Sequence, residues 1–459
     1  MNNSMPISEQ STETIAAIST PPGRGGIGIV RLGGPQATEI AVQLVRLRQP
    51  LEHTRARLAD VLDEDGAARI DEAVVTYFAA PNSYTAEDIV EIAAHGSPVV
   101  LELLLRRALQ LGARLAEPGE FTQRAFLSGK LDLTQAEAVR DLIEAQTLAQ
   151  ARQAASQMDG ALSRRVAPLK LSLLELVALL EAGIDFAEDD VHVTPQTEIA
   201  RRIDELMPPL AALEATFARG RILHDGLTLA IVGRPNVGKS SLFNRLAERD
   251  RAIVTATPGT TRDTVTERIS LDGIPLELVD TAGLRSATEE VEQLGILRSR
   301  EALADAALVV VVLDASLPLN DEERRLLAAV ADRPAIVALN KCDLLEATLP
   351  LPDCVGLPTL ATSALTGEGI SALRERILAL ATGGAAAEPG MLTSLRHQQA
   401  VAAALSALAD SARANAAATP HEMILLDLYR ALWALDSLTG QTTPDDILNL
   451  IFSTFCIGK

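Results

Sequence analysis

The 459-residue sequence predicts a multidomain chain that joins an α+β segment, an all-α segment and a doubly wound α/β segment with a mostly parallel sheet. Three observations predict this architecture. Short apolar, β-branched runs lie in the first 125 residues, and apolar residues recur at three- and four-residue steps from about 130 to 220. From 227 to 380, apolar strands alternate with helical stretches, which is typical of a parallel sheet covered on both faces.

The N-terminal segment is expected to mix strands and helices. A glycine-rich stretch leads into an apolar strand that ends near Arg31, and the run from Ala73 to Phe78 is rich in β-branched and aromatic residues. The stretch from Val99 to Leu111 is apolar at helical spacing. We therefore expect residues 1–125 to form one α+β domain.

Two leucine-rich stripes predict helices on either side of the α/β segment. The first is formed by Leu173, Leu174, Val177 and Leu180, and the second, beyond a linker at 383–390, by Leu425, Leu428, Leu432, Leu435 and Leu438. We expect residues 126–221 and 383–459 to form one discontinuous helical domain, with residues 222–382 inserted between them. Two separate small helical domains remain the alternative.

Composition limits the classes of function. A net charge of −20 argues against a protein that coats nucleic acid by bulk electrostatics, although a local basic groove or a partner's basic surface stays possible. Cys342, Cys354 and Cys456 are too few and too scattered for a disulfide framework or a zinc site. No apolar run approaches the roughly 20 residues of a membrane span, so we expect a soluble cytoplasmic protein.

A phosphate-binding loop is predicted directly after the apolar strand LTLAIV. The stretch from Gly233 to Ser240 has P-loop spacing, and the placement is physically required because the loop N–H groups and the following helix together bind phosphate. Lys239 is expected to reach the β- and γ-phosphates and Ser240 to ligate Mg²⁺. The nucleotide contacts predicted here are Asn236, Val237, Gly238, Lys239, Ser240 and Ser241.

The remaining parts of a guanine-nucleotide site follow in order. Asp280, Thr281, Ala282 and Gly283 end the strand IPLELV, where Asp280 would hold a Mg²⁺-bound water and Gly283 would donate to the γ-phosphate. Asn340, Lys341 and Asp343 follow the strand AIVAL, and a carboxylate there selects guanine through its N1–H and 2-amino donors. Ser363, Ala364 and Leu365 resemble the loop that contacts guanine O6. Four elements at strand ends predict a P-loop domain that binds GTP or GDP and hydrolyses GTP.

The hydrolytic mechanism departs from that of many small GTPases. Leu284 stands where a glutamine commonly orients the attacking water. Neutral oxygens beside the phosphates suit a large monovalent cation, so potassium is one hypothesis and an ordinary threonine-rich switch loop is the other. The segment in question, also expected to contact the nucleotide, comprises Thr255, Ala256, Thr257, Pro258, Gly259, Thr260 and Thr261.

The motifs GRPNVGKSS, TPGTTRD and DTAGLR resemble those of translation-factor-related, potassium-activated GTPases that switch by G-domain dimerisation. The termini PPGRGGIGIVR and FCIGK, with GEFTQRAFLSGKLDLTQAEAV between them, are similar to the MnmE (TrmE) family of tRNA uridine-modification GTPases. The resemblance covers essentially the whole chain. It implies an N-terminal folate-binding domain that forms the homodimer, a discontinuous helical domain and an inserted GTPase domain.

The resemblance also implies roles for individual residues. Potassium ligands fall on Asn236, Thr255, Thr257 and Thr260, and Mg²⁺ ligands on Ser240 and Thr261. Glu292 would help to position the hydrolytic water, although it also lies in an acidic stretch and could be a solvated helix charge.

The implied site for reduced folate, as 5-formyl- or 5,10-methylene-tetrahydrofolate, falls on Arg31, Glu91, Lys130 and Lys459. Such charges suit a glutamate tail and a pterin ring. Cys456 is a candidate catalytic thiol that could add to a uracil ring. It could instead line the site or be a semi-buried structural cysteine.

Two functions follow as hypotheses. In the first, the protein acts with the flavoprotein MnmG, as a heterotetramer, to install a carboxymethylaminomethyl or aminomethyl group at C5 of the wobble uridine, position 34, of tRNA. The alternative is a GTP-gated ribosome-assembly or scaffold GTPase without substrate chemistry. Such factors usually carry a basic RNA-binding appendage, whereas this chain ends in CIGK.

Overall fold

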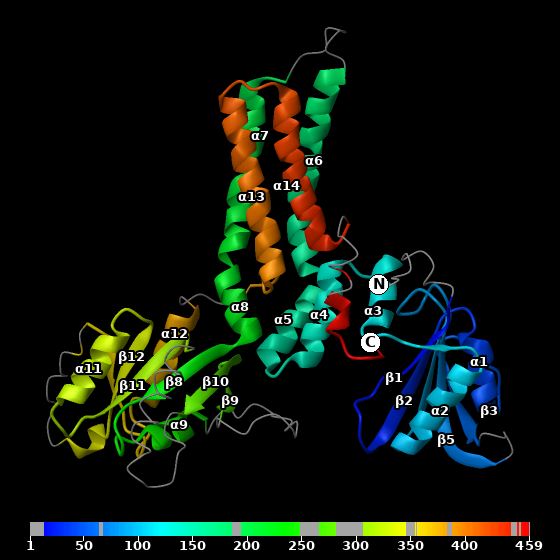
Figure 1. Ribbon diagram of the computed structural model, residues 1–459, viewed down its shortest axis with the longest axis horizontal. Helices are drawn as coiled ribbons and strands as arrows, with labels where there is room; N and C mark the ends of the chain where they lie inside the picture. Colours follow the sequence, from blue (N-terminus) through cyan, green and yellow to red (C-terminus); the bar gives the residue numbers. More distant parts are fainter. Residues whose placement is uncertain are drawn as a thin grey trace, which may run out of the picture. The chain divides into compact units, whose positions relative to one another are not determined.

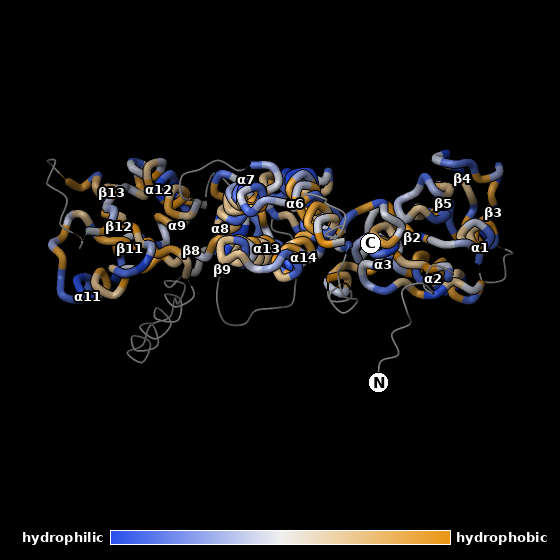
Figure 2. The backbone as a smooth tube through the Cα atoms, turned by 90° about the horizontal axis from the view of Figure 1, so that it is seen from above, coloured by the Kyte–Doolittle hydropathy of each residue, from blue (hydrophilic) through white to orange (hydrophobic). Residues whose placement is uncertain are grey.

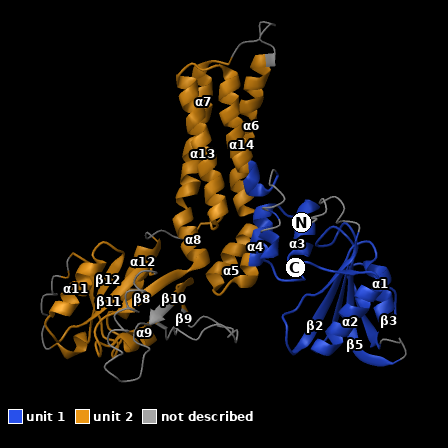
Figure 3. Ribbon diagram, viewed as in Figure 1, with its two compact units in different colours: residues 1–140, 436–459 blue, residues 141–435 orange. Residues whose placement is uncertain are grey.

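The computed structural model (Figure 1) describes residues 13–63, 68–185, 194–247, 266–280, 306–345, 354, 356–382, 388–441, 448 and 451–458. The chain forms two compact units, residues 1–140 with 436–459 and residues 141–435 (Figure 3). We describe each unit by itself. The finer boundaries at 125, 221 and 382 stay predictions.

The first unit is built on a seven-stranded sheet. Its elements are β1 (Ile15–Ile18), β2 (Gly25–Gly33), α1 (Ala37–Leu44), β3 (Val45–Leu47), β4 (Ala56–Leu62), β5 (Arg69–Phe78), β6 (Ile89–Gly96), α2 (Pro98–Gln110), β7 (Arg114–Leu115), α3 (Glu120–Leu127) and α4 (Leu133–Glu144), which runs four residues into the second unit. The strand order is β3-β4-β5-β6-β2-β1-β7, with all pairs antiparallel except β1 and β7. The predicted strands and helix in this segment are confirmed.

One face of this sheet is covered by α1 and α2. Ile40, Leu44, Leu101 and Leu104 from the two helices share a core with alternate residues of the strands, because a half-buried strand presents every second side chain to the same face. The C-terminal segment belongs to the same unit, where the ring of Phe452 packs 6.3 Å from that of Phe126.

The helical part of the second unit is made from both sides of the α/β segment. It contains α5 (Leu148–Met158), α6 (Ala161–Asp185), α7 (Gln196–Ala215), α8 (Phe217–Asp225), α13 (Leu395–Ala416) and most of α14 (His421–Thr439). Helix α7 packs along α13, which lies about 200 residues later, and the two run side by side in Figure 1. The helical domain is therefore discontinuous, as predicted.

The predicted leucine stripes lie on helices, and their side chains are buried with one exception. All five leucines of the second stripe are buried, as are Leu173, Val177 and Leu180 of the first. Leu174 lies on the predicted helix but is 46% exposed. Leu173 and Leu174 are adjacent, and a helix turns about 100° per residue, so both cannot face the same neighbour.

The inserted α/β part is a doubly wound fold. Its elements are β8 (Leu227–Val232), α9 (Lys239–Ala247), β9 (Thr266–Leu271), β10 (Ile274–Asp280), β11 (Leu308–Asp314), α11 (Asp321–Val330), β12 (Ala335–Asn340), the 3-10 turn η2 (Cys342–Leu344), β13 (Thr359–Ala361) and α12 (Ile370–Thr382). The strand order is β13-β12-β11-β8-β10-β9, and only β9 runs antiparallel.

Burial on both faces explains the uninterrupted apolar strands. Every residue of β11 is buried, with Val310 and Val312 in the core on one face and Val309 and Val311 in the core on the other. Figure 2 shows the contrast between these hydrophobic strands and α11, which begins with charged residues. Within the described part of the chain, no helix combines the length and the apolar character needed to cross a membrane.

Candidate guanine-nucleotide and folate sites

The predicted nucleotide motifs meet at one edge of the α/β sheet. Asp280 pairs with Ile231, so β10 ends beside the end of β8, and Asn340 pairs with Asp314 at the end of β11. The carboxyl ends of β8, β10 and β12 thus lie along one edge, where doubly wound sheets bind their ligands.

Two glycines allow the P-loop to fold as it does. Gly233 has φ +152°, and a Cβ there would lie 2.2 Å from the carbonyl oxygen of Val312. Gly238 has φ +95°, and its Cβ would lie 2.2 Å from Nδ2 of Asn340. Any side chain at either position would collide with atoms of the neighbouring strands. Asn236 also has a positive φ, of 65°, which asparagine tolerates better than most residues.

Lys239 begins α9 and points its ammonium group back to the start of the loop. Its Nζ donates hydrogen bonds to the carbonyl oxygens of Gly233 and Arg234, both at 2.7 Å. Ser240 and Ser241 follow in the first helical turn and are exposed. The loop therefore presents a cation and hydroxyl groups at a helix N-terminus, a combination suited to phosphate.

Asn340 lies at the centre of the predicted base-binding side. It is 2% exposed; its Nδ2 donates to the Val237 carbonyl oxygen at 2.9 Å, and its Oδ1 accepts from the Ala364 N–H at 3.0 Å. One side chain thus connects the P-loop with residues 363–365, which we call the base loop. Ser363 is buried and its Oγ accepts from the Thr366 N–H, whereas Leu365 is 79% exposed.

Lys341 and Asp343, which follow Asn340 in the same motif, differ in exposure. Lys341 has φ 63°, and its Nζ forms an ion pair with Asp314 at 2.6 Å. Burial acts to raise the pKa of Asp314, but hydrogen bonds from Lys341 and Ser316 outweigh it and hold that pKa below its usual value. Asp343, the predicted guanine-selecting carboxylate, is exposed at the same edge.

Cys342 is half-buried in this turn and its N–H donates to the carbonyl oxygen of Thr362. Burial, followed by the charges of Glu368 and Asp343, raises the pKa of its thiol. A raised pKa lowers the thiolate fraction, which agrees with the role of a small filler.

Several predicted site residues lie outside the described part of the chain. For Asp280 the structure describes the backbone only. The others are Thr255, Ala256, Thr257, Pro258, Gly259, Thr260, Thr261, Thr281, Ala282, Gly283, Glu292 and Lys459.

In the first unit, Arg31 and Glu91 are cross-strand partners on β2 and β6. The Nε and Nη2 of Arg31 lie 2.9 and 2.7 Å from the Glu91 carboxylate, while Nη1 donates to the carbonyl oxygen of Gly458 at 3.0 Å. The guanidinium also lies 5.4 Å from the ring centroid of Phe121. Neither Phe121 nor Gly458 carries a sequence signal for this contact, because both reach Arg31 only through the fold.

The C-terminal tail is held against this unit by its backbone. Ile457 pairs with Pro118, and the Gly119 N–H donates to the Cys456 carbonyl oxygen at 3.4 Å. Gly458 has φ +93°, and a Cβ there would lie 2.9 Å from the Ile18 carbonyl oxygen. Cys456 is exposed, so the semi-buried reading of its side chain was wrong. Lys130 is exposed just after α3.

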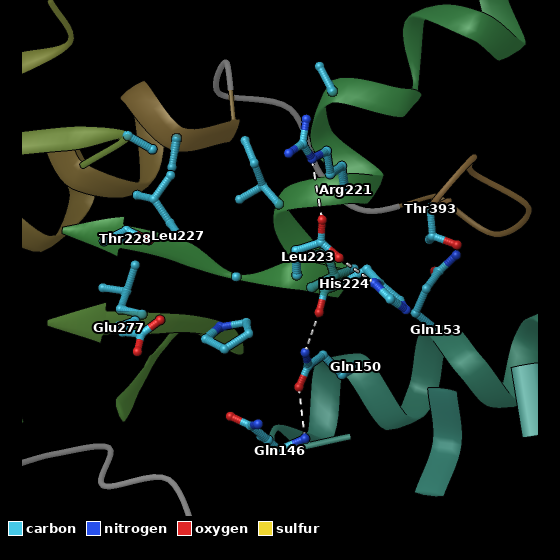
Figure 4. A pocket seen from close by; sticks show the side chains of 18 of the residues that line it. Gln146, Gln150, Gln153, Arg221, Leu223, His224, Leu227, Thr228, Glu277 and Thr393 are labelled. Carbon is cyan, nitrogen blue, oxygen red and sulfur yellow. Dashed lines mark hydrogen bonds and ion pairs between the residues drawn. The ribbon is translucent and has the colours of Figure 1, made fainter. Parts of the chain in front are cut away.

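A cavity of about 920 Å³ opens in the second unit (Figure 4). It is lined by α5, α8 and the amino ends of β8 and β10, which is the opposite edge of the sheet from the nucleotide motifs. Gln150 donates to the His224 carbonyl oxygen at 2.7 Å, and Thr147 donates to the Gly273 carbonyl oxygen at 2.6 Å. The cavity thus marks the junction of the helical and α/β parts.

His224 is one of several ionisable groups that line this cavity. Its Nε2 lies 3.2 Å from Asp141 and its Nδ1 lies 2.7 Å from Asp225. The hydrogen bond to Asp141, more than any other contact, raises the pKa of His224 to about 9, against the opposing effect of burial.

Comparisons with known proteins identify the family. A family model described as the MnmE helical domain matches residues 133–456, and one described as the GTP-binding protein TrmE N-terminus matches residues 14–130. The tRNA modification GTPase MnmE of Koribacter versatilis is 57% identical over 97% of this chain and 99% of its own length. The chain belongs to the MnmE family of tRNA modification GTPases. The MnmE of Chloroflexus aurantiacus is 44% identical over 97% of this chain and 100% of its own length.

Among solved structures, the G domain of the T. maritima FeoB iron transporter is 29% identical. It covers 34% of this chain and 98% of that chain with a TM-score of 0.26, and we draw nothing from a likeness at that score. As a member of the MnmE family, the protein is a GTP hydrolase that binds GTP and GDP and acts in tRNA modification.

Proposed function

We propose that this MnmE-family protein uses GTP hydrolysis to gate a folate-dependent modification at C5 of the wobble uridine, position 34, of tRNA. The flavoprotein MnmG is the proposed partner in a heterotetramer, and a homodimer formed by the N-terminal domain is the proposed core. The added group is carboxymethylaminomethyl or aminomethyl, with its carbon taken from 5-formyl- or 5,10-methylene-tetrahydrofolate. The reaction is proposed to take place in the cytoplasm.

The observation that carries the folate proposal is the contact of Arg31 with both Glu91 and the Gly458 carbonyl oxygen. It supports a site in which the C-terminal CIGK sequence and the side of β2 and β6 that bears Arg31 and Glu91 serve the same ligand. A guanidinium and a carboxylate match the glutamate tail and the pterin N–H donors of a reduced folate. Lys130 and Lys459 are proposed to complete the set.

Cys456 is an exposed thiol two residues before Gly458, whose carbonyl oxygen accepts from Arg31. We propose that it either adds to C6 of the uracil ring, which would activate C5, or lines the site without covalent chemistry. A Cys456→Ser variant distinguishes the two roles. It should retain folate binding and GTP turnover in both cases, and lose tRNA modification only in the first.

The GTPase cycle is proposed to depend on Mg²⁺ and potassium. Ser240 and Thr261 would ligate Mg²⁺, and Glu292 would position the attacking water. Asn236, Thr255, Thr257 and Thr260 would hold potassium, which would replace the charge of an arginine finger. Asn236 supports this assignment, because it is exposed in the P-loop at a positive φ and its side chain is not part of the core.

The ribosome-assembly alternative is disfavoured by the family assignment. Nucleoside analysis of bulk tRNA from cells that lack the protein tests the main proposal directly. Loss of the C5-substituted wobble uridine supports it, and an unchanged nucleoside profile with a ribosome defect would favour the alternative.

Folate binding is tested by calorimetry with 5-formyltetrahydrofolate. We expect heat with the full chain and a loss of binding in Arg31→Ala and Lys130→Ala. Arg46→Ala is the matched control, because Arg46 is an exposed arginine on β3 of the same sheet. Absence of heat with the unaltered protein contradicts the folate site.

Potassium dependence is tested by GTP turnover in KCl and in NaCl. We expect much faster turnover in KCl, and Asn236→Ala should abolish the difference. Asn244→Ala, at an exposed position on α9, should preserve it. Equal rates in the two salts for the unaltered protein would remove potassium from the mechanism.

A further inference from the structure

A basic side chain outside every recognised motif contacts the base loop. Arg245 lies on α9, the helix that begins with Lys239 of the P-loop. Its Nε donates to the Ala364 carbonyl oxygen at 3.0 Å, and its Nη2 donates to the Leu365 carbonyl oxygen at 2.8 Å. The helix that receives the phosphates is therefore tied directly to the loop predicted to receive the base.

With these contacts, both the N–H and the carbonyl oxygen of Ala364 in the base loop are hydrogen-bonded to side chains. The Ala364 N–H is held by Oδ1 of Asn340 at 3.0 Å, and the Ala364 carbonyl oxygen is held by Arg245. Ala364 packs partly against the apolar core, but Leu365, at the end of the base loop, is 79% exposed and has little apolar packing to fix it. Its position consequently depends on polar contacts, among which those from a guanidinium are the charge-assisted ones.

Arginine suits this role better than lysine. The planar guanidinium presents several N–H donors in a fixed fork, so it can hold two successive carbonyl oxygens at once. A lysine ammonium would keep the charge but has no rigid fork with which to hold both carbonyl groups in register.

We propose that Arg245 is a positioning residue for guanine recognition. It holds the base loop at the distance from the P-loop that lets the nucleotide reach both. This inference rests on the proposed contact between the base loop and guanine O6. It extends that contact by naming the side chain that sets its geometry and by linking base recognition to the phosphate-binding helix.

The test compares the binding of three nucleotides to the unaltered protein, to two Arg245 variants and to one control variant. Equilibrium dissociation constants of GDP, IDP and the 5′-diphosphate of 2-aminopurine riboside are measured for the unaltered protein, Arg245→Ala and Arg245→Lys. GDP and IDP carry O6, whereas the 2-aminopurine nucleotide does not. Arg376→Ala is the matched control, because Arg376 is an exposed arginine on α12 in the same α/β part of the chain.

For Arg245→Ala we expect about tenfold weaker binding of GDP and IDP, the size expected for losing a charge-assisted hydrogen bond. Binding of the 2-aminopurine nucleotide should change less than about twofold, because the contact that Arg245 positions is absent from it. Arg245→Lys should lie between the two proteins. In GTP turnover, KM should rise while kcat changes less.

The outcomes separate this inference from the function on which it rests. If the unaltered protein binds the 2-aminopurine nucleotide as tightly as GDP, the O6 contact itself is wrong. If GDP is preferred but Arg245→Ala keeps the preference, Arg245 has no positioning role. Equal weakening of all three nucleotides also overturns the inference, because it indicates general loss of structure. Should Arg245→Ala not fold, the same comparison with Arg245→Lys decides.

Discussion

The side-chain amide of Asn340 donates a hydrogen bond to the carbonyl oxygen of Val237 at 2.9 Å. This bond joins the end of β12 to the P-loop, and the same side chain accepts from the N–H of Ala364 in the base loop. Three segments separated by up to 127 positions in the chain are thus fixed by one buried amide. The amide has no apolar substitute, because its donor and its acceptor are both used.

Replacing Asn340 with alanine should therefore weaken both stability and nucleotide binding. The change leaves the Val237 carbonyl and the Ala364 N–H without this partner in a buried place, at a cost of about 2 kcal/mol. Urea unfolding without nucleotide and titration with GDP measure the two effects. Asn244→Ala, on the exposed side of α9, is the control. An unchanged urea midpoint in Asn340→Ala would contradict the structural role.

A comparison of two glycines separates backbone strain from collision in the P-loop. Gly238 and Gly356 both have positive φ, at +95° and +72°, so alanine should cost about 1 kcal/mol at each from conformation alone. A Cβ at Gly238 would lie 2.2 Å from Nδ2 of Asn340, whereas at Gly356 nothing lies within 4 Å. Only Gly238→Ala should abolish GDP binding, as measured by calorimetry. Equal binding by the two variants would show that the P-loop tolerates a shifted Asn340.

The ion pair between His224 and Asp141 should make stability depend on pH. Because the pKa of His224 rises to about 9 in the folded protein, its protonated form is stabilised by folding. The contribution is fully present below the unfolded pKa of roughly 6.5 and is lost as pH rises through about 9. Asp141 on α4 and Asp225 on α8 both favour the positive charge of His224. Arg221 pairs with Asp225, and Glu144 and Glu277 line the same cavity.

Asp141→Asn tests this dependence. The variant should unfold at lower urea than the unaltered protein at pH 6, by a free energy on the order of 2 kcal/mol given the partial exposure of His224. The difference should shrink as the pH rises past 9. Asp204→Asn, at an exposed position on α7, serves as the control. A difference that is the same at pH 6 and pH 10 would show that Asp141 acts without the charge of His224.

Arg31 should protect the C-terminal tail from proteolysis. Its Nη1 donates to the carbonyl oxygen of the buried Gly458. Removing the guanidinium therefore removes one of the hydrogen bonds that hold the tail. Arg31→Ala should be trimmed several-fold faster by carboxypeptidase, followed by mass spectrometry. Arg46→Ala should behave like the unaltered protein. Equal trimming of all three proteins would indicate that the pairing of Ile457 with Pro118 is enough to hold the tail.

Local sequence patterns were enough to predict the elements and to locate the nucleotide motifs at the ends of strands. Strands such as LVVVVLD are apolar throughout because both faces of a doubly wound sheet are covered, and Leu425 to Leu438 repeat with the period of a helix. The P-loop and the Asn340 motif can be recognised in the sequence, because each is short and follows directly after an apolar strand. The loop predicted to bind phosphate or base therefore has a fixed spacing from that strand. Both patterns involve only residues that are close together along the chain, so they can be read without the fold.

The tertiary structure alone decided which distant groups meet. Arg245 touches Ala364 and Leu365, more than 100 residues away, and Arg31 touches Gly458 near the other end of the chain. No periodicity encodes these contacts, because each depends on the order of strands in a sheet and on the path of the chain between them. Leu173 and Leu174 both suit a helix, and the packing of α6 buries the first and leaves the second exposed. Sequence patterns select a face of an element, and only the packing of that element decides what the face meets.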